Sequence, residues 1–79
     1  MSTKLLIDVR SEDEFEGGHR DGAVNVPIEN IMSGDLGVIA TLPKDTEIQC
    51  YCASGARSAV VKQILNQNGY MNVTNLGGL

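Results

Sequence analysis

The stretch QCYCASGARSAVVKQIL, residues 49–65, holds both cysteines of the chain and changes character in its middle. Residues 47–52 (EIQCYC) alternate apolar and polar side chains, which indicates a strand. Residues 57–68 repeat apolar side chains at helical spacing, which predicts a helix. The predicted inward face of this helix comprises Val60, Val61, Ile64 and Leu65. The small residues between the two segments predict a tight loop that joins the strand directly to the helix.

Strand-like and helix-like segments also alternate through the rest of the chain. Further strands are predicted at residues 5–9, 23–26 and 72–76. Helices or helical turns are predicted at residues 11–16, 28–32 and 38–42. This alternation is typical of the α/β class, so we expect one small domain over residues 1–79, with a parallel sheet of about four strands flanked by helices.

Individual residues support these elements. Ser11 and Glu14 form the capping-box pattern at the start of the first helix, and Phe15 is expected to turn inward. In the central strand, the alternation predicts Cys50 in the core and Tyr51 on the opposite face. These local signals agree with the order of elements proposed above.

Composition argues against several classes of function. The chain has 79 residues, 42% hydrophobic and 20% charged, which is typical of one globular domain, and we expect a monomer. The net charge of −4 argues against a nucleic-acid surface, and no apolar run approaches the ~20 residues of a membrane span. One His and two Cys fall short of a structural zinc site, so no metal or cofactor is expected.

The N-terminus lacks a signal-peptide pattern, which favours a cytoplasmic location, or a periplasmic one if a leader has been removed.

The loop after the central strand has the composition of a site for an anionic sulfur. Ligands of open α/β sheets bind beyond the carboxyl ends of the strands, and Cys52 lies at such an end. The N–H groups of residues 53–57 have no partners inside the following helix, so a curled loop would point them at the sulfur. Gly55 permits backbone angles closed to other residues, and Arg57 adds a positive charge. Because such donors and charges lower the pKa of a thiol, Cys52 is the predicted nucleophile.

The segment CASGARS, placed after a strand, resembles the active-site loop of the single-domain rhodanese family, the thiosulfate sulfurtransferases. Upstream, DVRSEDEFEGGHRDGAVNVP at residues 8–27 is similar to the other signature of this family, which runs D-V-R, E-F, G-H, G-A and N-[IV]-P. The closing segment NLGGL at residues 75–79 also matches. The resemblance covers nearly the whole chain, and it looks most like the compact bacterial phage-shock-protein-E type.

The resemblance implies a rhodanese-like fold and a transfer of sulfur in two steps. Cys52 would attack the outer sulfur of thiosulfate, or of a similar small anionic donor, and carry it as a persulfide to a thiol or cyanide acceptor. Arg57 would hold the donor and stabilise the leaving sulfite, and the resemblance implies no cofactor. The implied substrate-binding residues are Ala53, Ser54, Gly55, Ala56, Arg57 and Ser58.

Two other functions remain open on the sequence. Cysteine phosphatases also combine a cysteine, a loop and an arginine, but their loop is one residue longer than the four residues that separate Cys52 from Arg57. A persulfide carrier, or a docking module for a partner protein, would use the same domain with little free turnover. Measuring sulfur on Cys52 would separate these alternatives.

Nearby polar residues receive supporting roles at most. His19 matches the G-H position of the family motif and is expected to be structural. Asp8 and Arg10 are expected to pair and brace the loop. Arg20 and Asp21 replace the usual apolar residue and proline of the motif, and the sequence assigns them no function.

Overall fold

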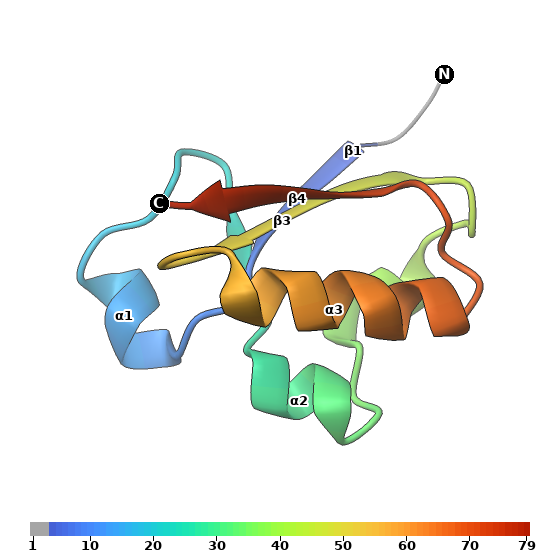
Figure 1. The fold of residues 1–79 in the computed structure, drawn as a ribbon, viewed down its shortest axis with the longest axis horizontal. Coiled ribbons are helices and arrows are strands. Elements are labelled where there is room, and N and C mark those ends of the chain that lie inside the picture. The colour runs from blue at the N-terminus through green and yellow to red at the C-terminus, as the bar shows by residue number, and fades with distance from the viewer. Residues whose placement is uncertain (1–3) are drawn as a thin grey trace.

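A computed structural model describes residues 4–79, and its elements alternate as the sequence predicts (Figure 1). The strands are β1 (Lys4–Asp8), β2 (Val24–Asn25), β3 (Glu47–Cys52) and β4 (Val73–Gly78). The helices are α1 (Glu12–Glu16), α2 (Ile28–Met32) and α3 (Ala56–Gln67), together with the 3-10 helix η1 (Gly37–Thr41). The predicted α/β class with a four-stranded sheet is confirmed. Within residues 4–79, every helix is too short or too polar to cross a membrane.

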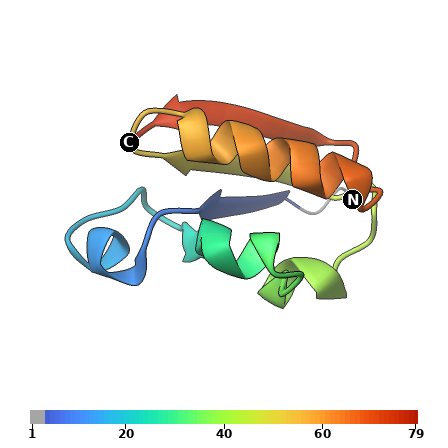
Figure 2. The ribbon, with the colours of Figure 1, turned by 60° about the horizontal axis from the view of Figure 1, so that its bottom comes forward.

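The four strands form one parallel sheet in the order β2-β1-β3-β4. β1 and β3 pair along the length of β1, from Lys4 opposite Glu47 to Asp8 opposite Tyr51. α2 and α3 lie beside each other on one face of the sheet (Figure 2). Because the strands are parallel, their carboxyl ends meet at one edge, where α1 and the loop after β3 also lie (Figure 1).

Buried side chains of the sheet and of α3 form one core cluster. The cluster includes Ile7, Ile48, Cys50, Val61 and Leu65. The predicted core position of Cys50 is therefore confirmed. The prediction that Val60 belongs to the inward face is wrong, because its side chain is 43% exposed. Successive helical residues are about 100° apart, so a face centred on Val61 and Leu65 turns Val60 toward solvent.

Tyr51 lies on the opposite face of β3 and is nevertheless completely buried. Its hydroxyl accepts a hydrogen bond from the Arg20 N–H at 2.9 Å, and the Arg20 guanidinium lies over the ring, 4.9 Å from its centroid. The Arg10 guanidinium lies 5.8 Å from the same centroid. The segment between α1 and β2 thus covers this side of the sheet, and Arg20, to which the sequence assigns no function, is one of the covering residues.

β4 is longer than predicted, because it continues through Gly77 and Gly78 instead of ending at residue 76. Gly78 lies so close to the loop after β3 that a Cβ atom there would collide with the Ala53 carbonyl oxygen. The Arg20 guanidinium stabilises this end of the strand, because its Nη2 donates a hydrogen bond to the Gly78 carbonyl at 2.6 Å. The absence of a side chain at Gly78 therefore lets the end of the sheet pack against the loop.

A buried ion pair stands at the carboxyl end of β1. Arg10 donates to Asp8, with Nη2 at 2.7 Å from Oδ2, and the Asp8 side chain is fully buried. Burial raises the pKa of the Asp8 carboxyl, but hydrogen bonds from Arg10 outweigh it and leave that pKa below its ordinary value. Arg10 also donates to the Gly18 carbonyl at 2.6 Å. The expected pair is confirmed, but the loop that it braces is the one after α1.

We predict that Asp8→Ala lowers the free energy of unfolding by about 3–5 kcal/mol, because it leaves Arg10 buried without its partner. Chemical denaturation at neutral pH measures the loss, with Asp21→Ala at an exposed position as the control. Because folding depresses the pKa of Asp8, its contribution is present above the unfolded pKa of about 3.9 and disappears as the pH falls through the folded value. A loss no larger than that of the control would contradict the role of the pair.

Candidate active site

Cys52 is the last residue of β3, and the loop that follows turns sharply to start α3 at Ala56. Gly55 makes this turn with a φ of 99°, in the left-handed region that favours glycine. A Cβ atom at Gly55 would also stand only 3.1 Å from the Cα of Gly77. In this conformation the Gly55 N–H donates to Cys52 Sγ at 2.9 Å. The loop therefore points a backbone donor at the sulfur.

Further donors reach the sulfur from the loop and from the first turn of α3. The N–H groups of Ser58 and Ser54 also act on it and help to lower its pKa, and the Ser58 hydroxyl oxygen lies 3.6 Å from it. Burial raises the pKa of the Cys52 thiol, but these hydrogen bonds outweigh burial and bring the pKa down to about 7. A large fraction of the sulfur is therefore ionised at neutral pH.

Cys50, two residues earlier on β3, has the opposite environment. Its sulfur lies 3.6 Å from the carbonyl oxygens of Ser58 and Thr74, which accept hydrogen bonds and cannot stabilise a thiolate. Burial raises the pKa of Cys50 to about 11. Burial raises the pKa of both thiols, but only Cys52 has hydrogen-bond donors that outweigh it.

Arg57, in the first turn of α3, forms an ion pair with Glu14 on α1. Its Nη1 and Nη2 donate to Oε1 and Oε2 of Glu14 at 2.7 and 3.0 Å. Hydrogen bonding from Arg57 holds the pKa of the Glu14 carboxyl down at about 2. The pKa of Arg57 is raised, chiefly by Glu14, and its interaction with Cys52 contributes to this rise. The guanidinium therefore interacts with the Cys52 sulfur while it is bound by Glu14, a carboxylate that the sequence does not connect to the site.

The same carboxylate closes the predicted capping box of α1. Ser11 N–H donates to Glu14 Oε1 at 3.2 Å, and Glu14 N–H donates to Ser11 Oγ at 3.2 Å. One side chain thus fixes both the start of α1 and the guanidinium on α3. Phe15, expected to turn inward, is only half-buried and stacks on His19 with ring centroids 3.7 Å apart. This contact agrees with a structural role for His19.

Asn75 on β4 also contributes to the site, and the sequence analysis misses it. Its Nδ2 donates to the Gly55 carbonyl at 3.0 Å, and its Oδ1 accepts from the Ser58 hydroxyl at 2.6 Å. The only signal in the sequence is the position of Asn75 in the closing segment NLGGL. That position gives no indication of hydrogen bonds to the loop after β3.

The sulfur is enclosed by its loop. Cys52 is only 1% exposed, whereas Ala53, Ser54 and Ala56 are exposed. The predicted loop residues are therefore brought together around the sulfur, but their outer side faces solvent. A donor molecule has to pass this loop before it can meet the nucleophile.

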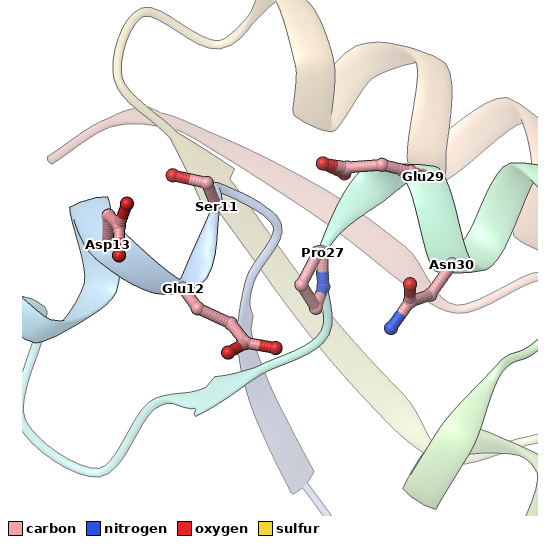
Figure 3. Close-up of a pocket in the computed structure, with 6 residues that line it drawn as sticks. All are labelled: Ser11, Glu12, Asp13, Pro27, Glu29 and Asn30. Carbon is pink, nitrogen blue, oxygen red and sulfur yellow. The ribbon is translucent and has the colours of Figure 1, made fainter.

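Two surface pockets lie away from Cys52. One, of about 350 Å³, opens between the starts of α1 and α2 (Figure 3). Its lining residues are Ser11, Glu12, Asp13, Pro27, Glu29 and Asn30. The carboxylates in this lining repel an anionic donor. The other, of about 510 Å³, is lined by Lys44, Asp45, Met71 and Asn72, before β3 and β4 begin. Among the residues described, 4–79, no group of three His, Cys, Asp or Glu side chains could hold a metal ion.

Known proteins share this arrangement of loop and sheet. The sequence pattern of the rhodanese-like domain family matches residues 1–79. The chain belongs to this family. It is 34% identical over 74 residues to the thiosulfate sulfurtransferase PspE of Escherichia coli strain K12, an alignment that covers 92% of this chain and 68% of the relative. It is 36% identical over 74 residues to a sulfurtransferase of Allochromatium vinosum, covering 94% of this chain and 65% of that protein.

A solved structure, described as a rhodanese with anions from E. coli, matches this rhodanese-like domain with a TM-score of 0.84 and 32% identity. The match covers 98% of this chain and 88% of that chain, so the expected family and fold are confirmed. The chain spans about two thirds of the length of the two curated relatives, at 68% and 65%. Both relatives are named sulfurtransferases, which supports sulfur transfer as the general class of reaction.

We predict that iodoacetamide alkylates Cys52 with a midpoint near pH 7, because the loop donors lower the pKa of its thiol to about 7. Mass spectrometry of the peptide that contains both cysteines follows the reaction across the pH range. Cys50, with a pKa of about 11, should stay unmodified at neutral pH, and Cys52→Ser should lose the reaction there. A midpoint near the ordinary thiol pKa of about 8.5 would contradict the effect of the loop donors.

Proposed function

We propose that this domain transfers sulfane sulfur from thiosulfate, or from a similar small anion, to a thiophilic acceptor through a persulfide on Cys52. One observation carries the proposal: the Gly55 N–H donates to Cys52 Sγ at 2.9 Å, and together with its neighbours it lowers the pKa of the thiol to about 7. A thiolate that is abundant at neutral pH is a ready nucleophile and needs no general base. The names of the relatives support the same class of reaction.

The first half of the cycle loads the enzyme. The Cys52 thiolate attacks the outer sulfur of thiosulfate, and a new S–S bond forms between the two sulfur atoms. The bond from the outer sulfur to the sulfite group breaks, and its electron pair leaves with sulfite. In the second half, cyanide or a thiolate attacks the outer sulfur of the persulfide, and the electron pair of the broken bond regenerates the Cys52 thiolate. No external oxidant or reductant is needed.

The loop can stabilise both forms of the site. The persulfide, like the thiolate, carries one negative charge, and backbone N–H groups preorganised around a sulfur anion stabilise either species. Arg57 supplies a positive charge next to this sulfur, where the dianionic donor and the leaving sulfite must pass. A similar rhodanese from E. coli has been solved with anions, which is consistent with a small anionic donor for this domain.

We predict that incubation with thiosulfate adds the mass of one sulfur atom to Cys52, and that cyanide then removes it as thiocyanate. Cys52→Ser should abolish both the adduct and thiocyanate production, because no other thiol lies under the loop donors. Cys50→Ala is the matched control and should retain both, since Cys50 lies in the core and not in the loop. An intact adduct in Cys52→Ser would disprove the proposed mechanism.

We predict that Arg57→Ala raises the KM for thiosulfate roughly tenfold to hundredfold, because hydrogen bonds to charged groups contribute about 1.5–3 kcal/mol. The substitution also leaves Glu14 without its partner, and that negative charge could repel the donor by itself. The double variant Arg57→Ala/Glu14→Gln removes the charge. A KM that stays high in the double variant supports direct contact between Arg57 and the donor. A KM that returns to the wild-type value would mean that Arg57 only neutralises Glu14.

The enclosed sulfur favours one alternative, a persulfide carrier with little free turnover. Cys52 is 1% exposed, so a partner protein that opens the loop on docking would gain access that a free anion lacks. A protein acceptor would then take the place of the small thiol. Loading from thiosulfate followed by thiocyanate release at many turnovers supports the enzyme, whereas loading without turnover supports the carrier.

A further inference from the structure

We propose that Asn75 is a positioning residue for the Cys52 sulfur, acting through Gly55 and Ser58; the inference deepens the proposed function and rests on it. Asn75 belongs to β4, the strand that follows α3 in the chain. None of its hydrogen bonds is to the Cys52 sulfur. Its amide group instead holds Gly55 and Ser58, the two residues whose donors lie at 2.9 and 3.6 Å from Cys52 Sγ.

The orientation of the Asn75 amide follows from its partners. Nδ2 donates to the Gly55 carbonyl at 3.0 Å, and Oδ1 accepts both the Gly77 N–H at 2.9 Å and the Ser58 hydroxyl at 2.6 Å. A flipped amide would place two N–H donors against the Gly77 N–H and an oxygen against the Gly55 carbonyl. The side chain therefore has one satisfied orientation, and both of its ends are committed to the active-site loop and its support.

The first route from Asn75 to the sulfur runs through Gly55. Glycine has more backbone freedom than any other residue, so the direction of the Gly55 N–H depends on what fixes the neighbouring peptide groups. The Gly55 carbonyl accepts from the Asn75 amide at 3.0 Å, the Ala59 N–H at 3.0 Å and the Ser58 hydroxyl at 3.1 Å. Only Asn75 comes from β4, so without it this carbonyl is held from within α3 alone, and the peptide group next to the one that donates to Cys52 Sγ loses its connection to the sheet.

The second route runs through the single proton of the Ser58 hydroxyl. Three acceptors lie within reach of it: Asn75 Oδ1 at 2.6 Å, the Gly55 carbonyl at 3.1 Å and Cys52 Sγ at 3.6 Å. Asn75 is the nearest and keeps the hydroxyl in a position beside the sulfur. Without Asn75 the hydroxyl turns to the Gly55 carbonyl, which is nearer and a stronger acceptor than sulfur, so its contribution to lowering the Cys52 pKa is lost.

A substitution at Asn75 leaves the other charged or titratable groups near the sulfur unchanged. They are Arg57 on α3, Glu14 on α1 behind it, and Cys50 on β3. A change at Asn75 therefore reports on the hydrogen-bonded support of the loop and not on the loss of a neighbouring charge.

The test is the pH dependence of Cys52 alkylation by iodoacetamide in Asn75→Leu, which removes the polar ends of the side chain. We expect the midpoint to rise from about 7 to about 8, so that alkylation at pH 7 slows roughly fivefold. Asn72→Leu, at an exposed position just before β4, is the matched control and should keep the wild-type midpoint. An unchanged midpoint in folded Asn75→Leu would overturn the proposal.

A second variant covers the case in which Asn75→Leu fails to fold. Asn75→Ser keeps a small polar side chain but removes the Nδ2 donor to the Gly55 carbonyl and adds no charge, so its midpoint should also rise. A midpoint at or below that of the wild type in this variant would also overturn the proposal. In thiosulfate turnover, Asn75→Leu should lower kcat more than it changes KM, because Asn75 does not touch the donor.

The alkylation result does not depend on sulfur transfer. If the wild type fails to load sulfur, the proposed function falls, while the comparison of midpoints still decides whether Asn75 positions the sulfur. If the wild type loads sulfur and the midpoints agree, only the inference about Asn75 falls.

Discussion

A negative charge on a buried sulfur is the constraint on which this site depends. Removing a charged group from water is costly unless hydrogen bonds or opposite charges replace the lost solvation. The Cys52 sulfur is enclosed, and hydrogen-bond donors of Ser58, Ser54 and Gly55 replace water around it, the Gly55 N–H at 2.9 Å. Because N–H groups remain donors at any pH, the loop stabilises the thiolate without a second titrating group. Cys50, beside carbonyl oxygens instead, keeps its proton.

The geometry that supplies these donors is assembled from segments far apart in the chain. β3 brings Cys52 to the edge of the sheet, and α3 begins where the loop ends, so the first N–H groups of the helix are free to face the sulfur. The end of β4 then packs against the loop, where a Cβ atom at Gly78 would collide with the Ala53 carbonyl and a Cβ atom at Gly55 would crowd the Gly77 backbone. The parallel order of the strands is therefore what gathers the donors, and the glycines are what allow the close approach.

The sequence predicts the local parts of this arrangement better than the distant ones. The bounds of β3, the capping box at Ser11 and the position of Cys52 follow from periodicity and motifs within a few residues. The ion pair between Arg57 and Glu14 joins residues 43 positions apart, and no local pattern specifies it. Burial of Tyr51 depends on Arg20, 31 positions away, and the support from Asn75 depends on a strand whose end was predicted too early. Such contacts follow from how the strands are ordered, which periodicity alone does not fix.

The enclosure of the Cys52 sulfur has opposite consequences for the two states of the proposed cycle, the loaded persulfide and the free thiolate. A closed loop keeps water and stray electrophiles from a persulfide, which lengthens the life of the loaded sulfur. The same closure slows exchange with a free anion, because the donor must displace the loop and pass Arg57, whose guanidinium is already bound by Glu14. Entry of the donor therefore competes with the ion pair between Arg57 and Glu14. The attraction between the donor's negative charge and Arg57 has to outweigh that pair. In the proposed cycle, the contacts that hold the loop closed and bind Arg57 therefore act on both the entry of the donor and the release of the carried sulfur.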